Sequence, residues 1–313
     1  MKVKDWIAFL ALGTVWGSSF LWIKIAVQDT SPLMLVAFRL SFAILALLSA
    51  AFIARPVLPQ GNRIWLILLL FGFFNVGIPY FLISWGEQYI ESAEAAILNS
   101  STPLFAMIIA HFALLDDRIT LQRLLGLVIG FIGIVIIVSR DLGTPNSPYE
   151  KSTFILMGQV AVLLASLLYA GSSVFARKNL HTLSPIMQGL IPLFGATAIL
   201  WLLIPLVDSP VELPARSITW ISLAWLGLLG TGLAFILYFH LIHSIGPTRT
   251  TLVTYIFPLV GVALGVIFLG ERLDWYLVVG AVMVIGSVVV VNQSRTSSII
   301  IDSKIHPKNE QIN

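Results

Sequence analysis

Polar side chains that could bind a small molecule occur in the middle of long apolar segments of this chain. A polar group surrounded by lipid is costly, so each needs a partner inside the protein or a water-filled cavity. Aromatic rings beside hydroxyl and amide groups suit a small amphipathic ligand. We therefore predict a substrate cavity, with close helix packing through small residues as the alternative for the serines. The predicted cavity-lining residues are Trp16, Ser18, Ser19, Asn75, Tyr80, Asn99, Tyr169, Ser172, Ser173 and Tyr255.

Three charged residues lie within or beside these apolar segments and form a predicted gate: Arg39, Lys24 and Glu87. Arg39 stands about 9 Å inside the second segment, at 1.5 Å of helix per residue. We expect it to contact an anionic substrate or to pair with Glu87, Glu91 or Glu94, with snorkelling to the interface as the alternative. Lys24, close to the end of the first segment, is better placed to snorkel.

Prolines interrupt the third, fourth and ninth apolar segments at Pro79, Pro103 and Pro258. Proline removes a backbone hydrogen bond and bends a helix. The freed carbonyl groups suit a hinge or a ligand contact, and we predict hinges at all three positions.

The sequence contains no pattern typical of an enzyme, an ATPase or a metal centre. Cysteine is absent, and no Walker A, GxSxG or HExxH motif occurs. His240 and His243 share a helix face without a third ligand, so we predict no catalytic residue, metal ligand or cofactor. The acidic group formed by Glu87, Glu91 and Glu94 leaves open a membrane-embedded enzyme acting on lipid-linked substrates. A passive channel is a further alternative.

Composition places these residues in a membrane protein. Of the 313 residues, 58% are hydrophobic and 11% charged, with a mean hydropathy of +0.95. Soluble domains carry roughly 45–50% apolar and about 25% charged residues, so a lipid bilayer is the expected partner. The net charge is only +3 without a basic face, which argues against nucleic acid.

Ten apolar runs are long enough to cross a bilayer, which takes about 20 helical residues. They cover approximately 6–26, 33–53, 64–85, 94–115, 121–139, 153–176, 184–206, 217–239, 247–269 and 274–292. Lys and Arg gather mainly on the side that holds both ends of the chain, which the positive-inside rule assigns to the cytoplasm.

The two halves of the chain repeat each other at an offset of about 154 residues. Gly17-Ser18-Ser19 returns as Gly171-Ser172-Ser173, Ser31-Pro32 as Ser184-Pro185, and Pro103 as Pro258. Because each half has five spans, the second half enters the membrane from the opposite side. Such inverted repeats support alternating access around a site near the midplane. The expected divisions are 1–139 and 153–292 for the repeats, 140–152 for a linker and 293–313 for a polar cytoplasmic tail.

Several of these residues form a pattern that resembles the EamA-type branch of the drug/metabolite transporter superfamily over about residues 5–292. They are Trp16-Gly17-Ser18-Ser19-Phe20 with Lys24, Arg39, and Pro258 followed by Leu269-Gly270-Glu271-Arg272-Leu273. A departure is Ala170, where the second half of the family often has tryptophan.

The resemblance implies a secondary transporter in the bacterial inner membrane that exports or exchanges amino acids and other small metabolites without ATP. A proton is one candidate for the coupling ion, and no oligomeric state is predicted. The expected fold is therefore an all-α integral membrane protein with ten transmembrane helices in two inverted five-helix repeats.

Overall fold

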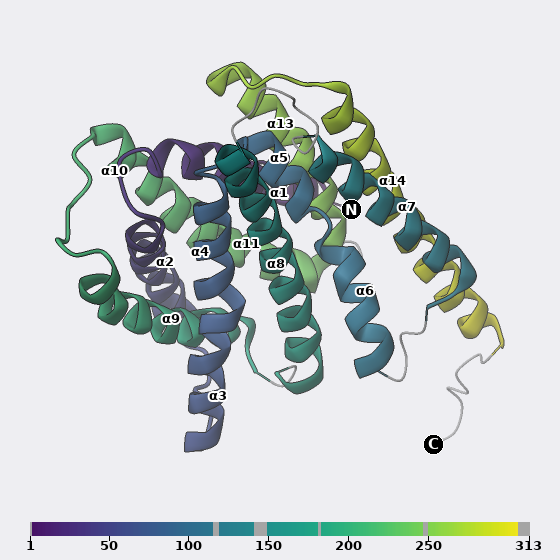
Figure 1. The fold of residues 1–313 in the computed structure, drawn as a ribbon. Helices are drawn as coiled ribbons and strands as arrows, with labels where there is room; N and C mark the ends of the chain where they lie inside the picture. Colours follow the sequence, from purple (N-terminus) through teal and green to yellow (C-terminus); the bar gives the residue numbers. More distant parts are fainter. Residues whose placement is uncertain (1, 115–118, 141–148, 181–182, 247–249, 306–313) are drawn as a thin grey trace.

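The computed structural model describes residues 2–114, 119–140, 149–180, 183–246 and 250–305. In this part the chain forms helices joined by connecting segments and contains no β-strand (Figure 1). Nine helical segments are long and apolar enough to cross a membrane, and the segment Trp275–Val290 adds a shorter apolar helix. The all-α integral membrane fold with ten spans is thus confirmed.

The first five spans include both continuous and interrupted helices. The first, second and fifth are single helices, whereas the third is interrupted by a π-helix and the fourth by a turn. Their bounds are α1 (Val3–Ala26), α2 (Pro32–Ala54), α3 (Asn62–Gly72) with η1 (Phe73–Gly77) and α4 (Ile78–Gly86), α5 (Ser92–Asn99) with α6 (Thr102–Ala113), and α7 (Leu121–Ser139).

The second half repeats this arrangement. Its helices are α8 (Tyr149–Asn179), α9 (Pro185–Val207), α10 (Ser217–Ala224) with η2 (Trp225–Leu233) and α11 (Ala234–Ile245), η3 (Thr251–Tyr255) with α13 (Ile256–Leu269), and α14 (Trp275–Ile305). The apolar part of the last helix is Trp275–Val290, and α14 continues beyond it into the expected tail through Ile305. The sequence offers no proline before Pro307 to stop it.

Irregular helix turns stand at each of the three predicted hinges. The π-helix η1 precedes Pro79, a turn at Ser100–Ser101 precedes Pro103, and the 3-10 helix η3 precedes Pro258. Wider or tighter turns of this kind accommodate the proline and often mark functional sites. A second π-helix, η2, occupies the eighth span, which corresponds to the third in the repeat.

Helix contacts between the two halves occur in matching pairs. The first span packs on the ninth (α1 on α13), and the sixth correspondingly packs on the fourth (α8 on α5 and α6). The second packs on the eighth (α2 on η2), and the seventh on the third (α9 on α3 and η1). The fifth and tenth spans, α7 and α14, pack on each other along one edge of the molecule (Figure 1). This pairing is the one that an approximate two-fold axis between inverted repeats produces.

The outer surface of α7 illustrates why the fold needs lipid. Glycines at positions 126, 130 and 133 are buried, and Gly133 meets Gly280 of α14 so closely that a Cβ would lie 2.9 Å from the Gly280 carbonyl oxygen. The opposite side of α7 exposes Leu121, Leu125, Val128, Ile132 and Val135. An apolar stripe of this length on an outer helix fits a hydrocarbon surrounding.

Among the glycine contacts between helices, the closest lies between α3 and α9. A Cβ on Gly72 would stand 1.8 Å from the carbonyl oxygen of Pro192. Overpacking of this kind typically costs about 1–3 kcal/mol, so we expect Gly72→Ala to lower the melting temperature of the detergent-solubilised protein measurably. Gly286→Ala is the matched control, because nothing lies within 4 Å of its added methyl group. Equal melting temperatures for both variants would show that Gly72 of α3 does not lie this close to Pro192 of α9.

Candidate substrate site

The centre of the site is Arg39, a buried arginine between the two halves of the chain. It is only 3% exposed, and its Nε donates a hydrogen bond of 3.1 Å to Oγ1 of Thr231 in η2. Its guanidinium carbon lies 3.7 Å from the centre of the Tyr80 ring of α4, a cation–π contact. Arg39 therefore connects its own repeat to the other, and it points into the bundle rather than snorkelling outward.

The local sequence of η2 explains how Thr231 reaches Arg39. Two of the three glycines in Trp225–Leu233 let α2 approach closely: a Cβ on Gly227 would lie 2.6 Å from the Arg39 carbonyl oxygen, and one on Gly232 would lie 2.4 Å from Cβ of Ala46. The Thr231 hydroxyl donates to the carbonyl of Leu226, five residues earlier, at 3.0 Å. Its oxygen is thereby oriented to accept from Arg39.

Two tyrosines complete one side of this centre. Tyr80 is 8% exposed, and its ring lies edge-on to that of Tyr169 in α8 with centroids 6.3 Å apart. Arg39, Tyr80, Tyr169 and Thr231 form what we call the arginine cluster. Two of its members come from each repeat, and it combines a cation, hydroxyl groups and aromatic surfaces.

The serines of α1 lie beside the arginine cluster. Ser18 accepts a hydrogen bond of 3.1 Å from the indole nitrogen of Trp225. Both Ser18 and Ser19 also donate to the carbonyl of Val15, at 2.8 and 3.3 Å. A Cβ on Gly230 would lie 3.2 Å from the Ser19 hydroxyl oxygen and 3.9 Å from an Nη atom of Arg39. The structure thus brings together five predicted residues: Ser18, Ser19, Arg39, Tyr80 and Tyr169.

Other predicted cavity residues contact different helices. Trp16 packs on Tyr238 and Phe257, with ring centroids 5.6 and 5.3 Å away. The Tyr255 hydroxyl donates to the carbonyl of Val288 in α14 at 2.8 Å. Trp16 and Tyr255 therefore lie in packing contacts with other spans.

The remaining predicted residues occupy the third, fourth and sixth spans. The Asn99 amide oxygen accepts from Ser166 of α8 at 3.2 Å, and half-buried Asn75 belongs to η1. Ser172 is buried, whereas Ser173 is exposed and donates to the carbonyl of Ala170. Within the described part of the chain, none of these residues forms a hydrogen bond with Arg39.

One side of the bundle is closed by polar contacts between the repeats, and we call it the latch face. Glu271, just after α13, accepts hydrogen bonds from the backbone nitrogens of Ser92 and Ala93 at 2.7 and 2.9 Å. The carboxylate thus caps the first turn of α5, where a negative charge is favourable. The contact ties the second repeat to the first.

An ion-pair network on Arg140 reinforces the latch face. Arg140 contacts Glu91 at 2.9 Å, Asp274 at 2.5 Å and Glu94 at 3.7 Å. Burial lowers the pKa of Arg140, but these three carboxylates outweigh it and the pKa lies above its usual value. Two of the acidic partners considered for Arg39, Glu91 and Glu94, therefore pair with Arg140 instead, because the start of α5 is adjacent to the end of α7.

A second pair of contacts joins the turn after α1 to the segment before α10. Asp29 accepts from the backbone nitrogen of Arg216 at 2.9 Å and from the Thr219 hydroxyl at 2.8 Å, while Ser31 donates to Asp208. The hydrogen bonds from Arg216 and Thr219 hold the pKa of Asp29 below its usual value. They are therefore retained near neutral pH and weaken as the pH falls through that lowered pKa.

Lys24 also belongs to the latch face, but not as a snorkelling side chain. Its ammonium group donates to the carbonyl oxygens of Glu87 at 2.5 Å and Ile90 at 2.7 Å. These carbonyls belong to the end of α4 and the turn after it, where a cation is favourable. The expectation that Lys24 reaches the interface is wrong, because partly buried backbone acceptors lie nearer.

Loss of the Glu271 carboxylate should open the latch face. A hydrogen bond to a charged group is worth about 1.5–3 kcal/mol, so Glu271→Ala should raise the population of the open form about tenfold or more. The measurement is the maleimide labelling rate of Ala93→Cys, whose position is fully buried beside Glu271 in a chain without natural cysteine. Glu212→Ala, at an exposed position, is the control. An unchanged labelling rate would contradict the latch.

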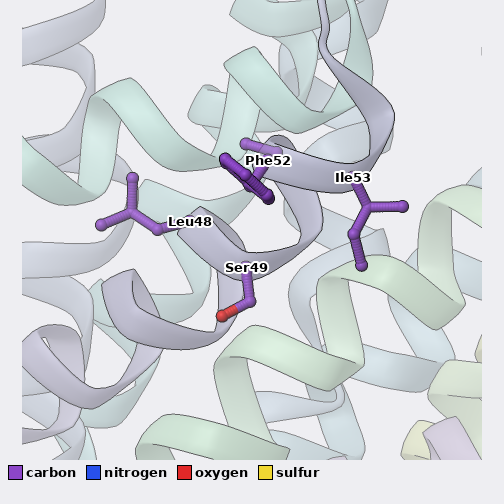
Figure 2. Close-up of a pocket in the computed structure, with 5 residues that line it drawn as sticks. Leu48, Ser49, Phe52 and Ile53 are labelled. Carbon is purple, nitrogen blue, oxygen red and sulfur yellow. The ribbon is translucent and has the colours of Figure 1, made fainter.

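An open groove of about 620 Å³ lies at the end of α2, away from these contacts (Figure 2). It is lined by Leu48, Ser49, Ala51, Phe52 and Ile53. Phe52 and Ile53 are more than three-quarters exposed, and the Ser49 hydroxyl donates to its own helix at Leu45. The groove has the character of a lipid-facing surface and contains none of the predicted site residues.

Sequence reasoning missed Thr231 and Trp225, which supply the second repeat's contacts to Arg39 and Ser18. One signal was present: Thr231 is a hydroxyl residue between two glycines in the middle of an apolar span. Trp225 gave a second signal, because it lies eight residues inside the span that begins at Ser217, too deep for an interfacial belt.

Ten spans in two related halves, with a buried cation held between them, define an integral membrane protein of the transporter class. Comparison with known proteins specifies it further. The EamA-like transporter family model matches residues 5–139 and 156–293, so this chain belongs to that family.

Similar proteins extend over nearly the whole chain. YoaV of Bacillus subtilis, an uncharacterized transporter, is 24% identical over 90% of this chain and 94% of its own. PagO of Salmonella typhimurium is 26% identical, covering 84% of each chain. YedA of Escherichia coli, an uncharacterized inner membrane transporter, is 26% identical over 85% of this chain and 83% of its own. A solved crystal structure with 18% identity shares the fold at a TM-score of 0.66, covering 95% of this chain and 99% of the other.

Proposed function

We propose that this protein is a secondary transporter that exports or exchanges small metabolites such as amino acids across the bacterial inner membrane. Both termini lie in the cytoplasm in this proposal, which puts the latch face on the outer side. The proposal joins the membership in a transporter family to the chemistry of the arginine cluster and to the arrangement of the two repeats.

The observation that carries the proposal is the placement of Arg39. Its side chain lies between the repeats, where a site open to either side must be. Arginine has five N–H donors, and within the described residues only Nε forms a protein hydrogen bond. The planar fork of its remaining donors suits a carboxylate. The rings of Tyr80 and Tyr169 offer apolar contact to the rest of an amphipathic substrate.

Unequal packing of repeat-related helices supports alternating access. Gly17 of α1 is so close to α13 that a Cβ would lie 2.7 Å from Cβ of Val260. At its repeat counterpart Gly171 in α8, a Cβ would have only Cδ1 of Ile109 within 4 Å, at 3.9 Å. One interface is thus tight and its counterpart loose, as expected for one of two interconverting states of an inverted-repeat protein. With both termini in the cytoplasm, as proposed, the closed latch face makes this the outward-closed state.

Counterflow in proteoliposomes tests the function. Vesicles loaded with a mixture of unlabelled amino acids should take up labelled amino acids transiently above equilibrium, because an exchanger moves one molecule inward for each moved outward. A channel equilibrates the label without this overshoot, and a lipid-modifying enzyme does not move it at all. Either of these results, with the protein shown to be folded and inserted, would contradict the proposal.

A further inference from the structure

Glu87, at the end of α4, is a buried carboxylate that the function proposed above does not use. Its side chain is 0% exposed, and neither carboxylate oxygen accepts a hydrogen bond from any residue that the structure describes. The hydroxyl of Ser84, one turn earlier, is buried and unpartnered in the same way. Two adjacent buried polar side chains without partners are uncommon and require an explanation.

These groups continue the arginine cluster along one face of α4. Tyr80, Ser84 and Glu87 follow the i, i+4, i+7 spacing, which puts them in a row on the same side of a helix. The row extends about 10 Å, at 1.5 Å per residue. Its inner end is the ring that contacts Arg39, and its outer end is the latch face.

Charges from several neighbouring elements act on the Glu87 carboxyl. Burial raises its pKa well above the ordinary value; Lys24 lowers it, Glu271 raises it and Arg39 lowers it. The Lys24 ammonium is hydrogen-bonded to backbone carbonyls, including that of Glu87, rather than to the carboxylate itself. The other titratable groups nearby are Glu91, just before α5, and Glu94 of α5, which both contact Arg140, and Tyr169 of α8.

We propose that Glu87 is a proton-binding site that takes up a proton when the latch face closes and returns it to water when the latch face opens. The proposal rests on the alternating access proposed above. Closing removes the carboxyl from water and brings Glu271 to the end of α4, and both changes favour the neutral form. A proton from the water on the latch face binds one carboxylate oxygen, and opening reverses the transfer.

The sign of the pH effect follows from this linkage. The closed state binds the proton more tightly, so acidity on the latch face favours closing and alkalinity favours opening. With one proton involved, the ratio of closed to open molecules should change up to about tenfold per pH unit between the two pKa values of the carboxyl. The pH of the outer compartment thereby regulates the exposure of the arginine cluster.

Spin-label distances across the latch face test the proposal without knowledge of the substrate. Labels on Gln28→Cys and Ala215→Cys, both exposed and on opposite repeats, report opening in the cysteine-free chain. In the wild-type background the short distance should dominate at low pH and decline as the pH rises. Glu87→Gln, which is permanently neutral, should keep the short distance at every pH, whereas Glu87→Asp should retain a pH response. The control Glu212→Gln, at an exposed position, should behave as wild type.

The outcomes separate this inference from the transport function. A wild-type distance that does not respond to pH, or an unchanged response in Glu87→Gln, would overturn the role of Glu87 and leave alternating access intact. If Glu271→Ala also fails to produce a second, longer distance, the latch face does not open at all. That result would contradict the proposed function and, with it, the inference.

Discussion

Replacement of Arg39 by alanine should reduce amino acid counterflow by about 30-fold or more. Truncating one partner of a buried, hydrogen-bonded charge pair costs about 2–5 kcal/mol, and the substrate's anionic group would lose its only buried cation in the arginine cluster. Thr231 and Tyr80 would also lose the partner that links the two repeats. The measurement is the initial counterflow rate at equal amounts of inserted protein.

Two further variants separate charge from geometry at this position. Arg39→Lys keeps the positive charge but loses the planar fork of donors, so it should recover only part of the activity. Arg63→Ala removes an exposed cation at the start of α3 and should transport as wild type. Normal counterflow by Arg39→Ala would show that the arginine cluster does not bind the substrate.

A bulky residue at Gly171 should stop transport without unfolding the protein. In the present state a Cβ at Gly171 would have only Cδ1 of Ile109 within 4 Å, at 3.9 Å, so the position is loosely packed. In the opposite state Gly171 should take the close contact that Gly17 makes now. Overpacking costs about 1–3 kcal/mol, so the opposite state should become about 5- to 150-fold rarer. The Gly171→Leu protein should keep its melting temperature, lose counterflow, and label slowly at Ala93→Cys.

The same substitution at the repeat counterpart, Gly17, should have the opposite effect. Gly17→Leu cannot fit against Val260 in the present state, so it should favour the opposite one and raise the labelling rate at Ala93→Cys. Gly286→Leu, with open space around it, should change neither rate. If the two glycine variants shift labelling in the same direction, the repeats do not exchange conformations.

The spans and the repeat could be predicted because their causes act locally. Lipid demands about 20 apolar residues per span, and matching motifs such as Pro103 and Pro258 remain visible along the chain. Irregular turns before these prolines follow from the missing backbone donor. The fold class therefore required no knowledge of tertiary contacts.

The partners of the charged residues could not be predicted, because they depend on how distant helices meet. Arg39 contacts Thr231 through a glycine-rich π-helix in the opposite repeat, and Lys24 contacts backbone carbonyls, which have no sequence signature. The separation of Trp16 from the serines could have been predicted. Residues two apart on a helix point about 200° from each other, so Trp16 and Ser18 cannot line the same wall.

The proposed transport cycle depends on the opposite orientation of the two repeats. Cysteine accessibility measures this orientation most directly. Gln28 and Asn179 are both exposed, and they lie just after the first span and at the end of the sixth span. Single cysteines at these positions in the otherwise cysteine-free chain should react with a membrane-impermeant maleimide from opposite sides of the membrane. Labelling of both positions from the same side would contradict the inverted repeat, and with it the proposed transport cycle.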